Sequence, residues 1–167
     1  KAHVFGVSLG GMIAQTFAIE FPERILSLIS VMSTTGDSDV GRPTDEAREL
    51  LLTPGSTIRE QAIELHLAGK KVWGSPGHID DEYERHFAGE VFDRACRPDG
   101  VGRQYKASRA DRSRSDRLRT LKVPTLVIHG DQDTLIDISG GRRTADVIPQ
   151  AEFFEVVGMG HDYPEYF

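Results

Sequence analysis

The sequence predicts an α/β fold, a mostly parallel sheet with a helical insertion, and three observations carry that prediction. Short apolar segments rich in β-branched residues, at 3–7, 25–32, 123–130 and 152–157, have the composition of buried strands. Most of the connecting stretches repeat apolar residues at three- and four-residue steps, as amphipathic helices do. About eighty residues of helical character separate the second strand from the third, which is too long for an ordinary crossover.

The first strand leads into a glycine turn with a serine at its centre. Residues 6–10 read GVSLG and match the pattern G-x-S-x-G, with Gly11 directly after them. A serine on such a strained turn needs small neighbours, and Gly11 lets the following helix pack close to the sheet. The apolar steps over residues 12–21 predict that helix. The strand–turn–helix context favours Ser8 as a nucleophile over an incidental serine.

The chain then continues as a βαβ unit. Pro22 ends the first helix, and residues 25–32 form a second strand that is apolar enough to be covered on both faces, as parallel strands are. The polar segment 33–39 follows this strand, where open α/β sheets place their ligand loops. The carboxyl end of the sheet is therefore the expected position of a site.

The insertion is predicted to consist mainly of several helices, and long insertions usually serve a site. An alternative is a purely structural helical subdomain. The sequence divides into a first core part at 1–36, the helical insertion at 37–119 and a second core part at 120–167. Helices are expected within the insertion near residues 44–52, 56–72, 80–97, 100–110 and 114–121.

The second core part holds two further strands and a helix. Pro124 is tolerated at the beginning of the third strand, and Asp131-Gln132-Asp133 forms the turn after it. A helix over 139–148 leads to the fourth strand, which is followed by Gly158-Met159-Gly160-His161.

Composition restricts the function classes. The 167 residues carry a net charge of −6, which disfavours a nucleic-acid partner and an anionic membrane surface. No apolar run approaches the length of about 20 residues that spans a bilayer, and Cys96 has no second cysteine to pair with. We therefore expect a cytoplasmic protein. The sequence has no CxxC, HExxH or P-loop pattern, so neither a metal nor a cofactor is expected.

Three strand ends carry groups suited to nucleophilic catalysis. Ser8 follows the first strand, an aspartate follows the third, and His161 follows the fourth. A serine, an acid and a histidine in this chain order are the order of the triad in α/β hydrolases. On chemistry alone, Asp131 and Asp133 are both candidates for the acid.

Several sequence blocks in this order resemble the α/β-hydrolase fold family. Within it, the chain is most similar to the capped actinobacterial-type hydrolases related to aclacinomycin methylesterases. The resemblance covers nearly the whole chain. Its blocks are GVSLGGMIAQ, PERILSLISVMSTTGD, LKVPTLVIHGDQD and GMGHD.

The resemblance implies roles for single residues. Ser8 would be the nucleophile and His161 the base, and the family's Gly-x-x-Asp spacing selects Asp133 as the acid. The first N–H groups of the helix after Ser8, that of Leu9 above all, would stabilise an oxyanion. The insertion would be a cap that closes over Ser8. Residues expected to line the substrate pocket are Met12, Met32 and Trp73.

The sequence also departs from the family, which has several strands and an oxyanion loop before the nucleophile. The chain therefore resembles a carboxyl-terminal portion with a partial sheet, and its first strand would expose an edge open to self-association. We expect a serine hydrolase that cleaves a small-molecule carboxylic ester through an acyl-enzyme. The alternatives are an acyltransferase or carbon–carbon bond hydrolase with the same triad, or a non-catalytic remnant or subunit that needs a partner for its missing half.

Overall fold

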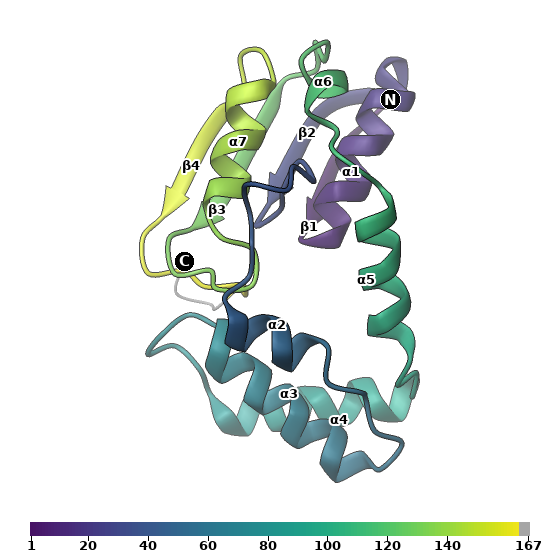
Figure 1. Cartoon of the computed structure of the whole chain (residues 1–167), viewed down its shortest axis with the longest axis vertical. Helices are drawn as coiled ribbons and strands as arrows, with labels where there is room; N and C mark the ends of the chain where they lie inside the picture. The colour runs from purple at the N-terminus through teal and green to yellow at the C-terminus, as the bar shows by residue number, and fades with distance from the viewer. Residues whose placement is uncertain (164–167) are drawn as a thin grey trace.

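The computed structural model describes residues 1–163 and contains one parallel sheet (Figure 1). Its four strands are hydrogen-bonded in the order in which they occur along the chain, so each βα connection leads to the neighbouring strand. This confirms the predicted α/β class and the parallel sheet. The strands are β1 (Ala2–Val7), β2 (Ile25–Val31), β3 (Thr125–Gly130) and β4 (Glu152–Val156).

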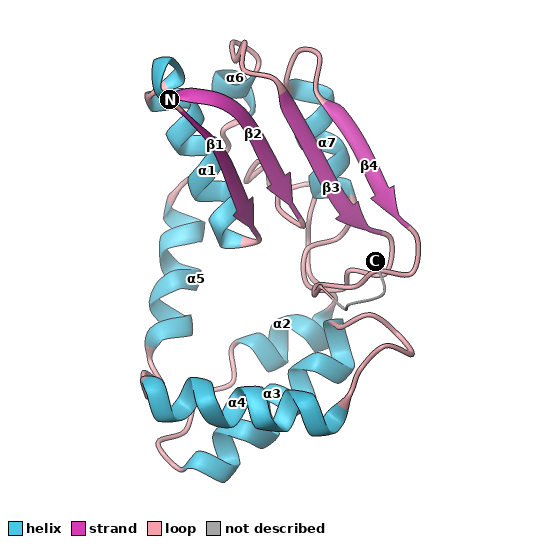
Figure 2. Cartoon of the chain, turned by 180° about the vertical axis from the view of Figure 1, so that it is seen from behind, coloured by secondary structure: helices cyan, strands magenta, loops and turns pink. Residues whose placement is uncertain are grey.

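The helices form two groups. Three of them, α1, α6 and α7, lie on one face of the sheet, whereas α2, α3 and α4 lie beyond the carboxyl ends of the strands (Figures 1 and 2). Helix α5 runs from the second group back toward α1. The α-helices are α1 (Leu9–Glu20), α2 (Asp45–Leu51), α3 (Arg59–Trp73), α4 (Asp81–Arg94), α5 (Gly100–Ala110), α6 (Ser115–Leu118) and α7 (Ser139–Val147).

Local capping explains where the predicted helices begin. The helix expected from residue 56 starts at Arg59, because the Ser56 hydroxyl accepts the Ile58 N–H and holds the preceding residues in a turn. Asp80 caps α4 by accepting the N–H groups of Glu82 and Tyr83. The predicted stop at Pro22 is a short 3₁₀ turn, η1 (Pro22–Arg24).

The main core lies between the sheet and the helices on its face. Apolar side chains of α1, α6, α7 and their strands form one buried cluster, and the insertion has a separate small cluster of Ile63, Leu67 and Ala88. Helices α3 and α4 therefore pack on a hydrophobic cluster that is separate from the one beneath the sheet. The main cluster consists of Ala14, Ala18, Ile25, Leu28, Leu118, Leu121, Val123, Val147 and Ile148.

The prediction that the second strand is covered on both faces is wrong for the described residues. Figure 2 shows that no helix within residues 1–163 lies on the face of the sheet opposite α1, α6 and α7. Leu26 of β2 is 45% exposed, and Phe5 of β1 and Phe154 of β4 are more exposed still. Strand β1 is one of the two edge strands of this sheet, and self-association through it stays a prediction. Across residues 1–163, each helix is too short or too polar to cross a membrane.

Candidate active site

Ser8 occupies a strained backbone position between β1 and α1. Its φ of 54° and ψ of −122° lie outside the regions that most residues adopt. Two hydrogen bonds hold it there: its N–H donates to Val31 O at 2.9 Å, and the Ser33 hydroxyl donates to Ser8 O at 2.9 Å. Strand β2 and the residues after it therefore fix the turn that presents the Ser8 side chain.

Two of the three glycines around Ser8 are required by close packing. A Cβ on Gly6 would lie 2.2 Å from Gly10 O, and a Cβ on Gly11 would lie 2.6 Å from the Ser33 Cβ. Gly11 thus allows the close approach of α1 to the end of β2, as the sequence predicts. Gly10 differs from that interpretation, because a Cβ there would meet no atom of the described residues within 4 Å. The backbone oxygen of Gly10 leaves no room for a side chain at position 6, whereas position 10 itself does not need to be glycine for steric reasons.

The structure brings Ser8, His161 and Asp133 into one hydrogen-bonded line. His161 Nε2 lies 2.9 Å from Ser8 Oγ, and His161 Nδ1 lies 2.7 Å from Asp133 Oδ2. The carboxylate can only accept, so Nδ1 carries the proton and donates it. Nε2 is then an acceptor for the Ser8 hydroxyl. Each of the three residues follows the carboxyl end of a strand, β1, β3 or β4. These strand ends face α2, α3 and α4 (Figure 2).

Asp133 is buried and saturated with donors. Its Oδ1 accepts the N–H groups of Leu135 and Ile136, at 2.9 and 2.8 Å, while Oδ2 faces two imidazoles. Burial raises the pKa of this carboxyl, but hydrogen bonds from His129 and His161 outweigh burial, so the pKa lies below its ordinary value. Asp133 is therefore an anion that holds the His161 ring in one orientation.

The second imidazole belongs to His129, whose contact with Asp133 the sequence interpretation did not anticipate. The fully buried ring places Nε2 2.7 Å from Ile136 O and 3.3 Å from Asp133 Oδ2. Both partners are acceptors, so Nε2 carries the proton. Nδ1 is buried and has no hydrogen-bond partner among residues 1–163, and Gly141 packs so closely that a Cβ there would lie 2.4 Å from it. The signal in the sequence was the spacing of four residues between His129 and Asp133 across a strand-ending turn.

Asp131, the competing acid, is directed elsewhere. Its Oδ1 accepts the Gly158 N–H at 2.6 Å and so fastens the turn after β3 to the segment that carries His161. The spacing argument that selects Asp133 agrees with this arrangement.

The predicted pocket residues have different surroundings. Leu9 and Met12 line a groove of about 420 Å³ between α1 and α5, which continues along α1 to Phe21. Met32 is 1% exposed and packs in a buried cluster with Val31 and Met159. The Trp73 ring covers Gly69, whereas its backbone oxygen reaches the His161 N–H. The Leu9 N–H is in the first turn of α1, where backbone donors have no partner within the helix.

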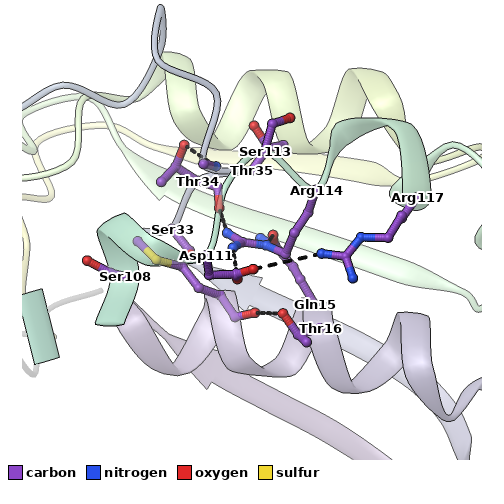
Figure 3. Close-up of polar contacts among 12 residues, drawn as sticks. Gln15, Thr16, Ser33, Thr34, Thr35, Ser108, Asp111, Ser113, Arg114 and Arg117 are labelled. Atoms are coloured by element: carbon purple, nitrogen blue, oxygen red, sulfur yellow. Dashed lines mark hydrogen bonds and ion pairs between the residues drawn. The ribbon is translucent and has the colours of Figure 1, made fainter. Parts of the chain in front are cut away.

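A buried arginine supports the elbow, which is the strand-to-helix turn over residues 6–11 that holds Ser8. Arg114, which is fully buried, donates to Gln15 Oε1 at 3.1 Å, to Thr34 O at 2.8 Å and to Asp111 Oδ2 at 2.5 Å (Figure 3). Burial lowers the pKa of Arg114, and the carboxylate of Asp111 opposes that effect. Because Thr34 follows Ser33 directly, this arginine joins the end of the insertion to α1 and to the segment that holds Ser8.

The family comparison agrees with this geometry. The profile of the family described as alpha/beta hydrolase fold matches residues 1–164. The chain belongs to the α/β-hydrolase fold family. The predicted family and fold are thereby confirmed.

Individual relatives of this α/β hydrolase are esterases and lipases. It is 27% identical to Lipase 3 of Moraxella sp. (strain TA144), over 96% of its own length and 50% of that protein. It is also 27% identical to the rhodomycin D methylesterase DauP of Streptomyces sp. (strain C5), over 98% of its length and 61% of the relative. The chain therefore spans between half and two thirds of these proteins.

A solved structure shows the same fold. The meta-cleavage product hydrolase CumD of Pseudomonas fluorescens IP01 superposes with a TM-score of 0.72 at 24% identity, covering 96% of this chain and 58% of CumD. As for metals, no group of three or more His, Cys, Asp and Glu side chains within residues 1–163 is placed to hold an ion.

Proposed function

We propose that this chain carries the catalytic triad of a serine hydrolase that cleaves a carboxylic ester, with Ser8 as nucleophile, His161 as base and Asp133 as acid. The observation that carries the proposal is the continuous line of hydrogen bonds from Ser8 Oγ through both nitrogens of His161 to Asp133 Oδ2. The esterase and lipase relatives support an ester as substrate class.

In the first half of the reaction, Ser8 Oγ attacks the ester carbonyl carbon while His161 Nε2 takes the hydroxyl proton. The carbonyl oxygen becomes an oxyanion, for which the Leu9 N–H at the start of α1 is the donor on this chain. His161 then gives its proton to the leaving alcohol oxygen as the carbon–oxygen bond breaks. The product on the protein is an acyl-enzyme on Ser8.

In the second half, water replaces the alcohol. His161 Nε2 takes a proton from the water as its oxygen attacks the acyl carbon, and returns it to Ser8 Oγ as the acyl group leaves as a carboxylic acid. Asp133 stays ionised throughout, because its two backbone donors and two imidazole donors favour the anion. It fixes the His161 tautomer and stabilises the imidazolium of each half-reaction.

The test compares wild-type protein with Ser8→Ala and with Ser27→Ala. Ser27 is in the amino-terminal part of β2, is bonded to His3, and serves as the matched control. Hydrolysis of p-nitrophenyl acetate and butyrate is followed together with intact mass after fluorophosphonate labelling. We expect a single adduct on Ser8 and loss of both adduct and turnover in Ser8→Ala alone. Wild-type turnover in Ser8→Ala would remove Ser8 from the mechanism.

Two further outcomes decide between the chemical alternatives. An acyl-enzyme that turns over faster with an added alcohol than with water would identify an acyltransferase. Cleavage of a vinylogous 1,5-diketone, with no cleavage of esters, would identify a carbon–carbon bond hydrolase. A folded wild-type chain without an adduct would favour the non-catalytic subunit, and the proposal would fail.

A further inference from the structure

The carboxyl end of α3 is joined to the segment that carries His161. We call this contact the junction, formed by residues 72–75 on the insertion side and residues 158–162 on the sheet side. The last carbonyl groups of any helix lack partners within the helix. At the end of α3, Trp73 O accepts the His161 N–H at 2.5 Å, and Val72 O accepts the Thr134 hydroxyl at 2.8 Å. The segments that carry the proposed base and acid thus supply the missing donors.

Two side chains complete the junction. The Ser75 hydroxyl, which is fully buried, donates to Asp162 Oδ1 at 2.5 Å and accepts the Gly160 N–H at 2.9 Å. The Ser75 N–H also donates to the Asp162 carboxylate, at 3.1 Å to each oxygen. Because Gly160 and Asp162 flank His161, these bonds and the one to Trp73 O fix three consecutive residues against the end of α3.

The backbones at the junction are in direct contact. A Cβ on Gly160 would lie 2.5 Å from Gly74 C and from Trp73 O, and a Cβ on Gly74 would lie 2.8 Å from Asp162 Oδ2. Neither position accepts a side chain without displacing the other segment. The glycine directly before His161 is therefore required by the close contact with the end of α3.

Charge at the junction is balanced from within α3. A carboxylate near a helix carboxyl end is unfavourable, because the helix dipole is negative there. Lys70 offsets this, since its Nζ lies 3.7 Å from Asp162 Oδ2 and 2.8 Å from Glu84 Oε1 on α4. The side chains of Asp162, Glu84 and Lys70 are 8%, 11% and 19% exposed, so solvent screens these charges little.

We propose that Ser75 and Asp162 are positioning residues that hold His161 in line with Ser8 through the end of α3, and that Lys70 balances the charge of the Asp162 carboxylate. The inference rests on the proposed function, because it concerns the orientation of the proposed base. It assigns the insertion a part in assembling the triad. Loss of these bonds would leave Asp133 in contact with the His161 ring, but it would release the backbone of Gly160 and Asp162 on either side of His161.

The experiment uses Ser75→Ala and Lys70→Met, with Lys71→Met as the matched control. Lys70→Met removes the cation beside Asp162 and should speed exchange at 158–162, and exchange as slow as in Lys71→Met would contradict the role of Lys70. Lys71 is the next residue of α3 and pairs at 3.3 Å with Asp81, but both side chains are about 60% exposed. Two quantities are measured: the second-order rate of Ser8 labelling by a fluorophosphonate, and hydrogen exchange of peptides covering 158–162. We expect Ser75→Ala to slow labelling about tenfold or more and to speed exchange at 158–162, since misplacement by about 1 Å can cost that much. Lys71→Met should match wild type.

A second background separates positioning from a general structural loss. In His161→Ala, Ser75→Ala should change residual labelling less than about twofold, because the group it positions is gone. An equal loss in both backgrounds, or wild-type labelling in Ser75→Ala, would overturn the inference. If wild type itself is not labelled, the proposed function fails. In that case hydrogen exchange at 158–162 still tests the contact at the junction. Unchanged exchange in Ser75→Ala would overturn the positioning role of Ser75, independently of the proposed function.

Discussion

His129 and His161 share one oxygen atom of Asp133. His161 Nδ1 lies 2.7 Å from Oδ2 and His129 Nε2 lies 3.3 Å from the same atom. The two rings differ in their surroundings. The His161 ring reaches Ser8, whereas the His129 ring is fully buried and hydrogen-bonded to Ile136 O. His129 therefore supplies a fixed donor to the same carboxylate oxygen that His161 contacts. It keeps Asp133 ionised and limits rotation of its carboxylate.

Replacing His129 tests that donor. His129→Leu removes the bond to Asp133 and leaves Ile136 O unsatisfied, which should cost about 1–3 kcal/mol of unfolding free energy. The pKa of Asp133 is lower in the folded protein than its ordinary value of 3.8, so ionisation of Asp133 stabilises the fold at pH values above 3.8. This contribution is lost as the pH falls through the pKa that Asp133 has in the folded protein. The stability difference between wild type and His129→Leu should therefore narrow below about pH 4.

The conservative variant His129→Gln supplies the control, because its amide N–H can replace the Nε2–H. We expect it to recover most of the ester hydrolysis rate lost in His129→Leu, measured as kcat from pH 5 to 9. Equal rates and pH profiles for both variants would contradict a role for the donor.

The sequence alone was sufficient for the strands themselves and for the turn that holds Ser8, because both depend on local patterns. An apolar strand, a G-x-S-x-G turn and a helix period define Ser8 within a short stretch of chain. His161 and Asp133 followed from chain order and from a family spacing. Their hydrogen bonds in the structure agree with those choices.

Contacts between distant segments were beyond the sequence. The partners Ser75 and Asp162 are separated by 87 positions, and no period or motif relates them. Gly10 shows the opposite error, since a motif position was given a steric reason that the packing does not support. Burial of β2 was also overestimated, because an apolar strand pattern does not show whether a second layer is present to cover it.

The elbow glycines give a paired prediction. Gly6→Ala would place a Cβ 2.2 Å from Gly10 O, a backbone atom that cannot move without displacing Ser8, and should destabilise the protein by about 3 kcal/mol. Gly10→Ala has free space and lies in a helix, where alanine is favoured by up to about 1 kcal/mol. Chemical denaturation of both variants measures the contrast. Similar midpoints for the two would show that the elbow relaxes more easily than the structure implies.

Asp37 predicts a specific acid sensitivity. Burial raises its pKa, but the hydroxyls of Ser113 and Ser115 and the guanidinium of Arg143 outweigh burial and lower the pKa from 3.8 to about 2. Ionised Asp37 thus stabilises the fold above about pH 4, and that contribution is lost as pH falls toward 2. Asp37→Asn should lower stability at pH 7 by about 1–2 kcal/mol and flatten the stability curve in that window. A parallel pair of curves for wild type and variant would contradict this assignment.

The buried side chain of Arg114 predicts a large loss of stability on its replacement. Arg114→Met keeps an unbranched apolar stem in the buried space but removes the donors to Gln15 Oε1, Thr34 O and Asp111 Oδ2 (Figure 3). Gln15 is fully buried and cannot recruit water, whereas Asp111 is partly exposed and can be hydrated. Leaving buried polar groups without partners should cost about 3 kcal/mol, measured by urea denaturation at pH 7.

The matched control for this prediction is Arg112→Met, which makes the same charge change two positions earlier. Arg112 is exposed, so its loss should change stability by less than about 0.5 kcal/mol. Arg114 also supports the segment that holds Ser8, so a variant that remains folded should label more slowly with a fluorophosphonate than Arg112→Met does. Equal stabilities for the two variants would show that the buried guanidinium is no more favourable than methionine in that space. Equal labelling rates would show that Arg114 stabilises the fold without affecting the reactivity of Ser8.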